Sequence, residues 1–469
     1  MQTAAPLPPP RPVRANEHVL IARLAPVKDF GKIVDMPRGA DRREAAFDLL
    51  SEHAAKTQRP VIELLEKLRA EKKVRTYESM FLPNAVLVDP VPEHEKAVRQ
   101  ALEGVASINK VVQNGLWSVD TTPGEGLQAL DIAADAAGAT PPKEPRGAAW
   151  GVRKINADKL HRQGITGKGI TIGIIDSGLD SHHPAIEKHY RGSKRFSSQQ
   201  EHEYNWLDPF NFIGVPYDDS SHATHASGSM VGQTRNYTIG VAPGARLIAA
   251  KGIRGDGMND TVATLKAGQF MLAPTNTAGR NPDPRKGADI VNNSWGNSLD
   301  QNDETFRETW KGWIAAGIIP VASAGNEGPN PGTVGSPGGF SEGISVAATN
   351  EGDHVTEFSS VGPSKLSPGE MVPLIGAPGR DIVSSIPGNG TAPKSGTSMA
   401  GPHVAGAVAL LLSVDHDASI DEIKRALTKT AVDIDTEGPD PSSGYGRIDV
   451  EAAVKYLKAG KAKADAPAA

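Results

Sequence analysis

A serine stands between small side chains in the segment Gly396-Thr397-Ser398-Met399-Ala400-Gly401-Pro402-His403, directly before the apolar run 404–412. That run predicts a buried helix, too short to span a membrane, which puts Ser398 at the helix N-terminus. Backbone N–H groups and the helix dipole favour negative charge there, which suits a hydroxyl that must become a nucleophile. A lone serine at this position is also a common helix cap. Nucleophilic chemistry therefore needs a base, an orienting acid and an oxyanion donor elsewhere in the chain.

Two segments hold the candidate acid and base. Asp176 ends the apolar run 170–175, and the carboxyl end of a buried strand is where α/β folds place catalytic groups. Capping the next turn is the alternative role for this carboxylate. His222 and His225 lie among small residues, and histidine is the natural general base near neutral pH. A structural, hydrogen-bonded histidine remains the alternative for each.

Asn326 is the candidate oxyanion donor. It follows the apolar run 318–322 within Ala324-Gly325-Asn326, so its amide can point at a charge that develops near the strand end. An asparagine in an ordinary turn is the alternative. Asp176, His222 and Ser398 occur in the order Asp, His, Ser, which is the order of the subtilisin triad.

These motifs together resemble those of the subtilisin-like serine proteases (subtilases, peptidase family S8). The family's blocks Asp-Ser/Thr-Gly, His-Gly-Thr-His, Ala-Gly-Asn and Gly-Thr-Ser-Met-Ala-x-Pro-His correspond to residues 176–178, 222–225, 324–326 and 396–403. Residues 240–245 match as well, and Asn292-Asn293-Ser294-Trp295-Gly296, with the insert 272–274 before it, resembles the bacillopeptidase F branch. The resemblance covers roughly residues 150–455.

The resemblance implies a serine endopeptidase in which Ser398 attacks, His222 is the base, Asp176 orients it and Asn326 binds the oxyanion. It also implies a substrate cleft whose expected residues are Ser294, Trp295 and Gly296 as one wall, Gly335 at the base of the S1 pocket, and Glu327 at its rim. Gly335 could equally be a turn glycine. The expected partners are protein or peptide substrates.

One residue departs from the family pattern. Ala223 replaces the glycine that follows the histidine, and its methyl group is expected to crowd the start of the helix. A catalytically impaired subtilase acting as a binding module is therefore an alternative hypothesis. A metal-dependent hydrolase using His182, His183 and His189 is a third, and it rests only on local histidine density.

The chain also predicts the elements that would position these residues. Continuous apolar runs at 170–175, 246–250, 290–291, 318–322 and 344–347 alternate with helical patterns at 260–272, 303–316, 402–412 and 420–430. Such an alternation favours an α/β fold with a mainly parallel central sheet buried on both faces. By the resemblance, this is the three-layer subtilisin-like fold.

A smaller α+β unit precedes it. Strands at 18–24, 75–82, 85–88 and 108–112 and helices at 41–74 and 93–105 give the order β-α-β-β-α-β of a ferredoxin-like unit, with Pro60 expected to break the first helix. By resemblance this unit is an inhibitory, folding-assisting propeptide that leads residues 114–120 into the cleft. The chain is expected to divide into a disordered lead 1–15, the propeptide 16–120, a linker 121–149, the catalytic domain 150–457 and a disordered tail 458–469. The linker is expected to hold a weak helical turn at 127–136 and the maturation site.

Composition limits the other function classes. Of 469 residues 38% are hydrophobic and 22% are charged, as in ordinary globular proteins. A net charge of −5 argues against nucleic acid as a partner, and the lack of cysteine excludes disulfides and a thiol nucleophile. No membrane segment is expected. A monomer is expected.

Calcium and location complete the expectations. The chemistry requires no cofactor, although subtilases usually bind structural calcium. Residues 232–239, where many of them carry a calcium loop, contain no carboxylate; Asp208, Asp218 and Asp219, or Asp256 and Asp260, are the alternative candidates. The resemblance favours an extracellular location, while residues 1–12 lack the apolar core of a signal peptide.

Overall fold

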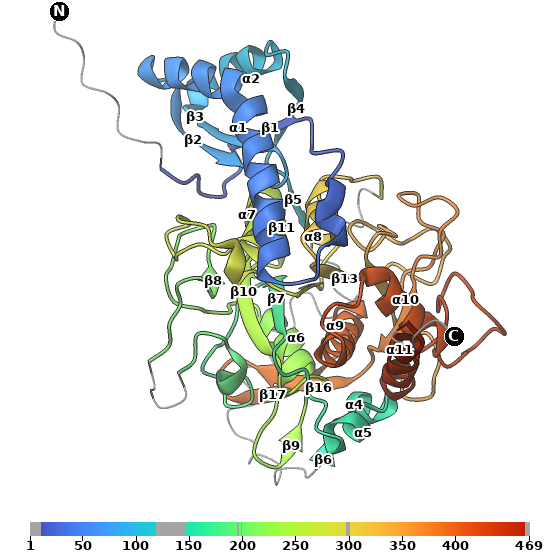
Figure 1. Ribbon diagram of the computed structural model, residues 1–469. Coiled ribbons are helices and arrows are strands. Elements are labelled where there is room, and N and C mark those ends of the chain that lie inside the picture. Colours follow the sequence, from blue (N-terminus) through green and yellow to red (C-terminus); the bar gives the residue numbers. More distant parts are fainter. Residues whose placement is uncertain (1–10, 119–146, 195–196, 198, 297–300, 465–469) are drawn as a thin grey trace, which may run out of the picture.

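The computed structural model describes residues 11–118, 147–194, 197, 199–296 and 301–464 (Figure 1). Residues 11–118 form an N-terminal unit, and residues 147–464 form a larger C-terminal domain. The expected weak helical turn at 127–136 lies outside the described residues.

The apolar runs of the C-terminal domain form one seven-stranded sheet in which all neighbouring strands run parallel. The strand order is β15-β14-β13-β12-β7-β10-β8. The strands are β7 (Thr171–Asp176), β8 (Trp206–Leu207), β10 (Arg246–Lys251), β12 (Ile290–Asn293), β13 (Ile319–Ser323), β14 (Ile344–Thr349) and β15 (Ile375–Pro378). This confirms the predicted parallel sheet.

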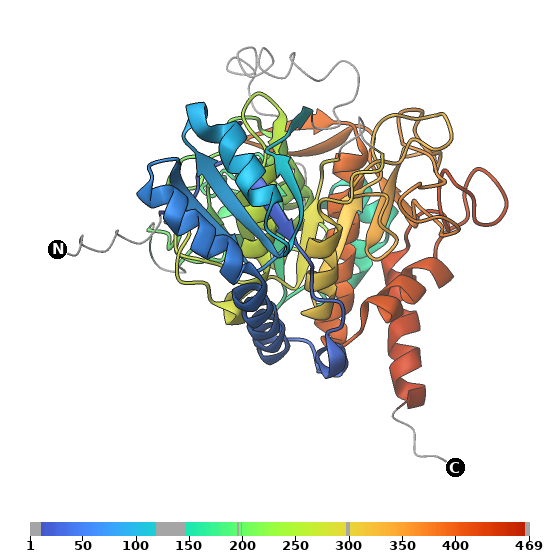
Figure 2. The same ribbon diagram turned by 90° about the horizontal axis from the view of Figure 1, so that it is seen from above.

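Helices cover both faces of the sheet. They are α4 (Trp150–Lys154), α5 (Ala157–Arg162), α6 (His222–Val231), α7 (Thr261–Leu272), α8 (Arg307–Ala315), α9 (Thr397–Val414), α10 (Ile420–Lys429) and α11 (Val450–Ala464). Side chains alternate along each strand. Ile172 and Ile174 pack in the cluster that contains α6, α9 and α11, whereas Ile175 packs in the cluster that contains α7 and α8. The three-layer subtilisin-like architecture is therefore confirmed (Figure 2).

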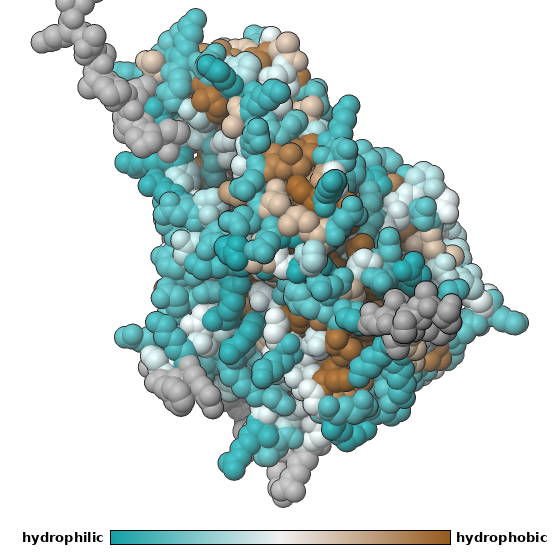
Figure 3. Space-filling model, in the orientation of Figure 1, coloured by the Kyte–Doolittle hydropathy of each residue, from teal (hydrophilic) through white to brown (hydrophobic). Residues whose placement is uncertain are grey.

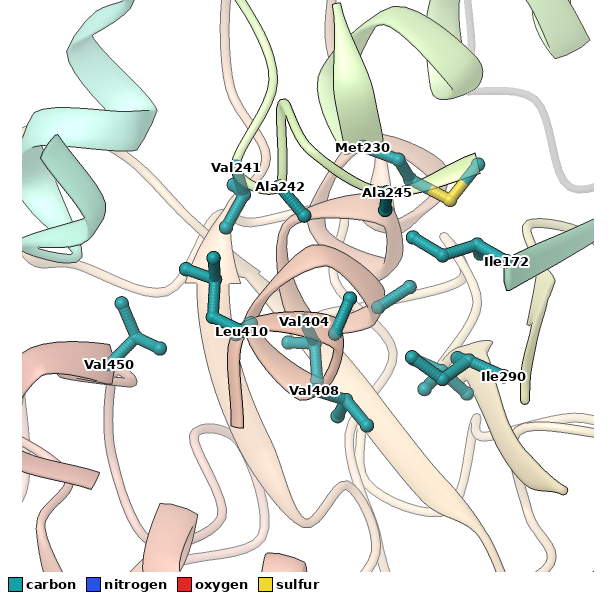
Figure 4. Packing of buried hydrophobic residues seen from close by; sticks show 14 of the residues in the cluster. Ile172, Met230, Val241, Ala242, Ala245, Ile290, Val404, Val408, Leu410 and Val450 are labelled. Atoms are coloured by element: carbon teal, nitrogen blue, oxygen red, sulfur yellow. The ribbon is translucent and has the colours of Figure 1, made fainter. Parts of the chain in front are cut away.

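Helix α9 forms the centre of the first cluster. Figure 4 shows Val404, Val408 and Leu410 of this helix among side chains such as Ile172 of β7 and Ile290 of β12. Within the described part of the chain, α9 is the one helix long and apolar enough to cross a membrane, but it is 89% buried in the protein. It begins at Thr397, five residues before the predicted start, so Ser398 is its second residue.

The N-terminal unit has the predicted order β-α-β-β-α-β. Its antiparallel sheet has the order β2-β3-β1-β4, which is ferredoxin-like. Its elements are β1 (Leu20–Leu24), α1 (Ala40–Ala70), β2 (Val74–Met80), β3 (Ala85–Pro90), α2 (Glu95–Glu103) and β4 (Ile108–Gln113). The predicted break at Pro60 is wrong. Helix α1 continues through it because buried residues before it, such as Ala54, and after it, such as Val61, hold both halves in place.

Short elements complete the fold and correct three expected boundaries. They are β5 (Leu116–Ser118), β6 (Gly147–Ala148), β9 (Tyr237–Thr238), β11 (Met258–Asp260), β16 (Ile382–Ile386), β17 (Gly390–Lys394) and the 3-10 helices η1 (Gly31–Asp35), η2 (Pro92–His94), η4 (Glu187–His189) and η5 (Pro284–Lys286). Strand β6 pairs with β9, so the last residues of the expected linker are ordered. Residues 458–464, expected to be disordered, continue α11. Val13, in the expected disordered lead, is buried and donates its N–H to Glu78.

The surface is mainly hydrophilic on the face that Figure 3 shows, and hydrophobic residues appear there in small areas. Large exposed hydrophobic residues such as Val34, Val215 and Tyr456 come from separate parts of the chain.

Three buried histidines predict a loss of stability in mild acid. Burial lowers the pKa of His189 and of His225 to about 3 and that of His403 to about 4. Below their usual pKa near 6.5, these side chains bind protons in the unfolded chain but not in the folded one. The free energy of unfolding should therefore fall as the pH drops from 6.5 to 5, because each histidine then binds a proton in the unfolded chain that it does not bind in the folded one.

Urea unfolding followed by tryptophan fluorescence at pH 7.5, 6.5 and 5.0 measures this slope. A His182→Gln variant is the control, because it removes a histidine whose side chain is 60% exposed instead of a buried one. Equal stability at pH 6.5 and pH 5.0 would contradict the prediction.

Candidate active site

The predicted catalytic residues meet at one edge of the parallel sheet. Asp176 is the last residue of β7, Ser294 follows β12, and Asn326 lies three residues after β13. His222 is the first residue of α6 and Ser398 the second of α9. The carboxyl ends of parallel strands form the edge at which α/β folds bind ligands.

Asp176 and His222 form a hydrogen-bonded pair. The His222 Nδ1 atom lies 2.8 Å from Oδ1 and 3.0 Å from Oδ2 of Asp176. The carboxylate has no solvent exposure, and it also accepts the Ser177 N–H at 2.6 Å. Because Nδ1 donates to Asp176, Nε2 is the ring nitrogen that remains to accept a proton.

Ser398 and Ser294 bind each other in both directions. Ser398 Oγ donates to the Ser294 carbonyl at 3.1 Å, and Ser294 Oγ donates to the Ser398 carbonyl at 2.9 Å. Between described atoms, no hydrogen bond joins Ser398 Oγ to His222, since the single hydroxyl proton is already donated. Gly396, just before α9, has φ +154°, a conformation that glycine adopts without strain.

The Asn326 amide is held in one orientation by Thr397. Its Oδ1 accepts the Thr397 N–H and the Thr397 hydroxyl, both at 2.9 Å. The donor end, Nδ2, lies 3.6 Å from the point at which a Cβ would stand on Gly396. The amide N–H groups therefore lie beside the backbone that leads into Ser398.

The other predicted cleft residues have different surroundings. Trp295 is buried, and its ring meets the Phe306 ring edge-on at 5.1 Å between centroids. Gly296 is buried directly after it. Gly335 is buried, and its carbonyl accepts the Gly339 N–H. Glu327 is exposed and donates its backbone N–H to Ser360.

Asp218 is a site residue that the sequence reasoning missed, because it was considered only as a calcium ligand. Its Oδ1 accepts the Ser177 hydroxyl at 2.8 Å and the Ser221 N–H at 3.0 Å. Its Oδ2 accepts the Thr224 N–H at 2.9 Å. The carboxylate thus joins the end of β7 to the first turn of α6. An aspartate four residues before the first helical residue, His222, is the signal that could have indicated this capping role.

Ala223 fits its position. The residue is fully buried in the main core cluster, and its N–H donates to the Ser177 hydroxyl at 3.0 Å. The expected crowding at the start of α6 is not observed, because the methyl group packs into this cluster.

The histidines of the metal hypothesis do not form a metal site. Within the described ranges, no group of three or more His, Cys, Asp or Glu side chains could hold a metal ion. His183 Nε2 donates to the Gly390 carbonyl, His189 is buried, and His182 is exposed.

The calcium candidates already have partners within the protein. Asp208 accepts three backbone N–H groups, Asp219 pairs with Lys251, and Asp256 pairs with Arg254. Asp260 caps α7 through the Ala263 N–H. These carboxylates therefore do not fit the oxygen-rich cluster that calcium requires.

Strand β5 of the N-terminal unit lies along the C-terminal domain. It pairs antiparallel with β11, so that Leu116 is opposite Asp260 and Ser118 is opposite Met258. Just before it, Asn114 Oδ1 accepts the Val262 N–H at 2.9 Å, and Asn114 Nδ2 donates to Asp260 at 2.8 Å. The unit thereby caps the N-terminus of α7.

Known proteins share this arrangement of motifs. The sequence profile of the subtilase family matches residues 167–446, more than half of the chain. The chain belongs to the subtilase family. Bacillopeptidase F of Bacillus subtilis (strain 168) is 40% identical over 335 residues, which cover 69% of this chain and 23% of that protein. Subtilisin of Bacillus pumilus is 30% identical over 309 residues, which cover 65% of this chain and 98% of that protein.

Membership confirms the predicted family. The chain spans about a quarter of the length of bacillopeptidase F.

Asp218 should act as a positioning residue in this subtilase. We expect Asp218→Asn to lower kcat by about 100-fold with little change in KM, because a small shift of α6 displaces His222 from Ser398. Steady-state kinetics on a short peptide, together with the pH profile of kcat/KM, measure the effect.

The matched control is Asp219→Asn, which removes the neighbouring carboxylate that binds Lys251 instead of α6. A kcat for Asp218→Asn equal to that of this control would show that Asp218 does not position the histidine.

Proposed function

We propose that the chain is a serine endopeptidase that hydrolyses peptide bonds of proteins through an acyl-enzyme on Ser398. The observation that carries the proposal is the hydrogen-bonded pair of the buried Asp176 and the partly buried His222 at the same sheet edge as Ser398, at the N-terminus of α9. A base with an orienting acid beside a serine at a helix start is the arrangement that nucleophilic catalysis requires.

The reaction would begin when Ser398 leaves the Ser294 carbonyl and turns toward His222. His222 Nε2 takes the hydroxyl proton as Ser398 Oγ bonds to the scissile carbonyl carbon. The protonated ring then gives that proton to the leaving amine, and the acyl-enzyme forms. Water, activated by the same ring, hydrolyses the ester and restores Ser398. Asp176 holds Nδ1 and stabilises the imidazolium throughout.

The Asn326 amide and the Ser398 backbone N–H would stabilise the oxyanion. The two hydrogen bonds from Thr397 to Asn326 Oδ1 support this role, because they fix the orientation of the Asn326 Nδ2 group before negative charge develops on the substrate oxygen. Loss of one such donor typically lowers kcat by about 10²–10³. The chemistry needs no metal, since the described groups supply every proton transfer.

Substrates would bind as an added strand beside β11, with Ser294, Trp295 and Gly296 on the other side. Extended peptides commonly bind exposed sheet edges in this way. Gly335 at the base of the S1 pocket would leave room for a large P1 side chain, and the exposed Glu327 could attract Lys or Arg at its rim. A peptide-library profile led by Gly or Ala at P1 would contradict this specificity.

The N-terminal unit would be an inhibitory, folding-assisting propeptide. Two observations support this: β5 occupies the edge of β11 that a substrate strand would use, and Asn114 caps α7. Residues 114–118 of the expected segment 114–120 would therefore lie in the cleft like a product, and a cut in the linker 121–149 would allow the enzyme to be released.

A binding module without catalysis is the second candidate, and one observation favours it. Ser398 Oγ is bound to the Ser294 carbonyl and not to His222. Catalytic hydrogen bonds are often long or misaligned in unliganded enzymes and tighten when substrate binds, so the hydrolase hypothesis explains the same observation.

A fluorophosphonate reagent distinguishes these two functions. We expect it to modify Ser398 of the matured protein and to abolish peptide hydrolysis, with no effect of a metal chelator on the rate. Mass spectrometry of the labelled peptide identifies the site, and Ser398→Ala is the control. A folded, matured protein that is not labelled would exclude the acyl-enzyme mechanism.

Expression of residues 148–469 alone tests the role of the N-terminal unit. Because a parallel sheet forms from non-local contacts and folds slowly, we expect little active enzyme without the unit. Active-site titration per mole of purified protein provides the measurement, with the full chain as reference. Full and rapid activity of the shorter chain would refute the folding role.

A further inference from the structure

Three arginines at the start of α1 bind the C-terminal domain. They lie more than 70 residues before β5 in the sequence. Arg38 lies just before α1, and Arg42 and Arg43 lie in its first turn. Figure 1 shows α1 running from the N-terminal sheet down along the C-terminal domain. We call Arg38, Arg42 and Arg43 the arginine clamp.

Arg42 binds the end of a helix. Its Nε donates to the Ala315 carbonyl at 2.8 Å and its Nη2 to the Ile314 carbonyl at 3.1 Å. These are the last two residues of α8, where unpaired carbonyls and the helix dipole favour a cation. The guanidinium thus binds the Ala315 carbonyl and is a second donor to the Ile314 carbonyl, which also accepts the Gly317 N–H at 3.0 Å.

Arg43 and Arg38 bind around Asp289, directly before β12. Arg43 Nη1 lies 3.1 Å from Asp289 Oδ1, and both side chains are less than 10% exposed. The other carboxylate oxygen accepts the Thr171 N–H of β7 at 2.9 Å. Arg38 Nη2 donates to the Asp289 carbonyl at 2.9 Å. Burial lowers the pKa of Arg38 to about 10, so it stays charged at neutral pH.

The clamp lies apart from the contact at the cleft. In Figure 2, the start of α1 is at the edge of the molecule away from β16 and β17. Between the two contacts runs an apolar cluster to which Ala46 and Leu50 of α1 and Leu272 and Trp313 of the C-terminal domain belong. The N-terminal unit is therefore held by the clamp and by Asn114, and elsewhere by this apolar packing and by polar contacts such as the one from Lys266 Nζ to Glu78 at 2.7 Å.

We propose that the arginine clamp is a second docking site, which holds the N-terminal unit on the protease independently of β5. The inference rests on the proposed role of the unit as a propeptide. After the chain is cut between the two parts, withdrawal of β5 from the cleft and departure of the unit are then separate events. The occupant of the surface around Asp289 and the end of α8 is residues 38–43 of this chain.

The test uses a full chain that cannot digest itself. A recognition sequence for an unrelated site-specific protease is inserted between residues 121 and 146 of the Ser398→Ala variant. After this cut, dilution followed by size-exclusion chromatography measures the Kd of the N-terminal fragment for the rest. Binding is thus measured without any catalytic activity.

The clamp variant is Arg42→Ala with Arg43→Ala. We expect it to raise the Kd by at least about 30-fold, because the buried Asp289 carboxylate then loses its arginine and keeps only the Thr171 N–H and His416 nearby. Arg59→Ala is the matched control, since Arg59 lies on the same helix, is 79% exposed and pairs with Glu63. It should change the Kd by less than about twofold, as expected for a surface pair.

Asn114→Ala tests independence from the cleft. The complex should remain associated in this variant, and combining it with the clamp variant should multiply the two changes in Kd, because the contacts share no partner. If the double arginine variant fails to fold, Arg42→Gln should still raise the Kd several-fold. A Kd unchanged by that variant, or by the clamp variant, overturns the proposal.

Failure of the proposed function gives a different result. In that case the matured wild-type protein is not labelled at Ser398, whatever the Kd of the fragment. If Ser398 is labelled but the Kd of the fragment is the same with and without the clamp arginines, the proposed protease activity stands and only the second docking site is refuted.

Discussion

A carboxylate without solvent exposure is stable only where donors surround it, and the active site is built around one such group. Asp176 meets this requirement through His222 Nδ1 and the Ser177 N–H. Each donor is in turn held by Asp218, which accepts the Ser177 hydroxyl and the N–H groups at the start of α6. The positions of β7 and α6 therefore cannot change separately without leaving a buried acceptor unpaired.

The parallel sheet explains why the other groups arrive at the same place. Strands β12 and β13 lie beside and beyond β7 in the sheet, so their carboxyl ends deliver Ser294 and Asn326 to the edge that holds Asp176. Helix α9 packs against the same sheet and brings Ser398 to this edge from the other direction. The reciprocal bonds between Ser294 and Ser398 join the two sets of elements.

The sequence marked the candidate residues of the site better than their connections. Asp176, His222, Ser398 and Asn326 were predicted because small neighbours and apolar runs mark the ends of buried elements, and because the motifs resemble those of subtilases. Asp218 was missed because a surface-like run of acids and serines has the same composition whether it binds solvent or caps a helix. Pro60 was misread because local propensity cannot register the tertiary contacts that keep α1 continuous.

The N-terminal unit shows the same limit on a larger scale. Its strand order follows from alternating patterns, yet the contacts that fix it to the protease come from residues without any sequence signal. Arg43 and Asp289 are 246 positions apart, and each alone resembles an ordinary surface charge. Only the fold shows that they form a buried pair. Since a buried charge is far more costly to leave unpaired than a surface one, loss of either partner is costly, although neither residue carries a signal in the sequence. If the N-terminal unit is the proposed inhibitor, contacts that hold it can therefore lie far from the cleft, where they do not constrain the residues of the candidate active site.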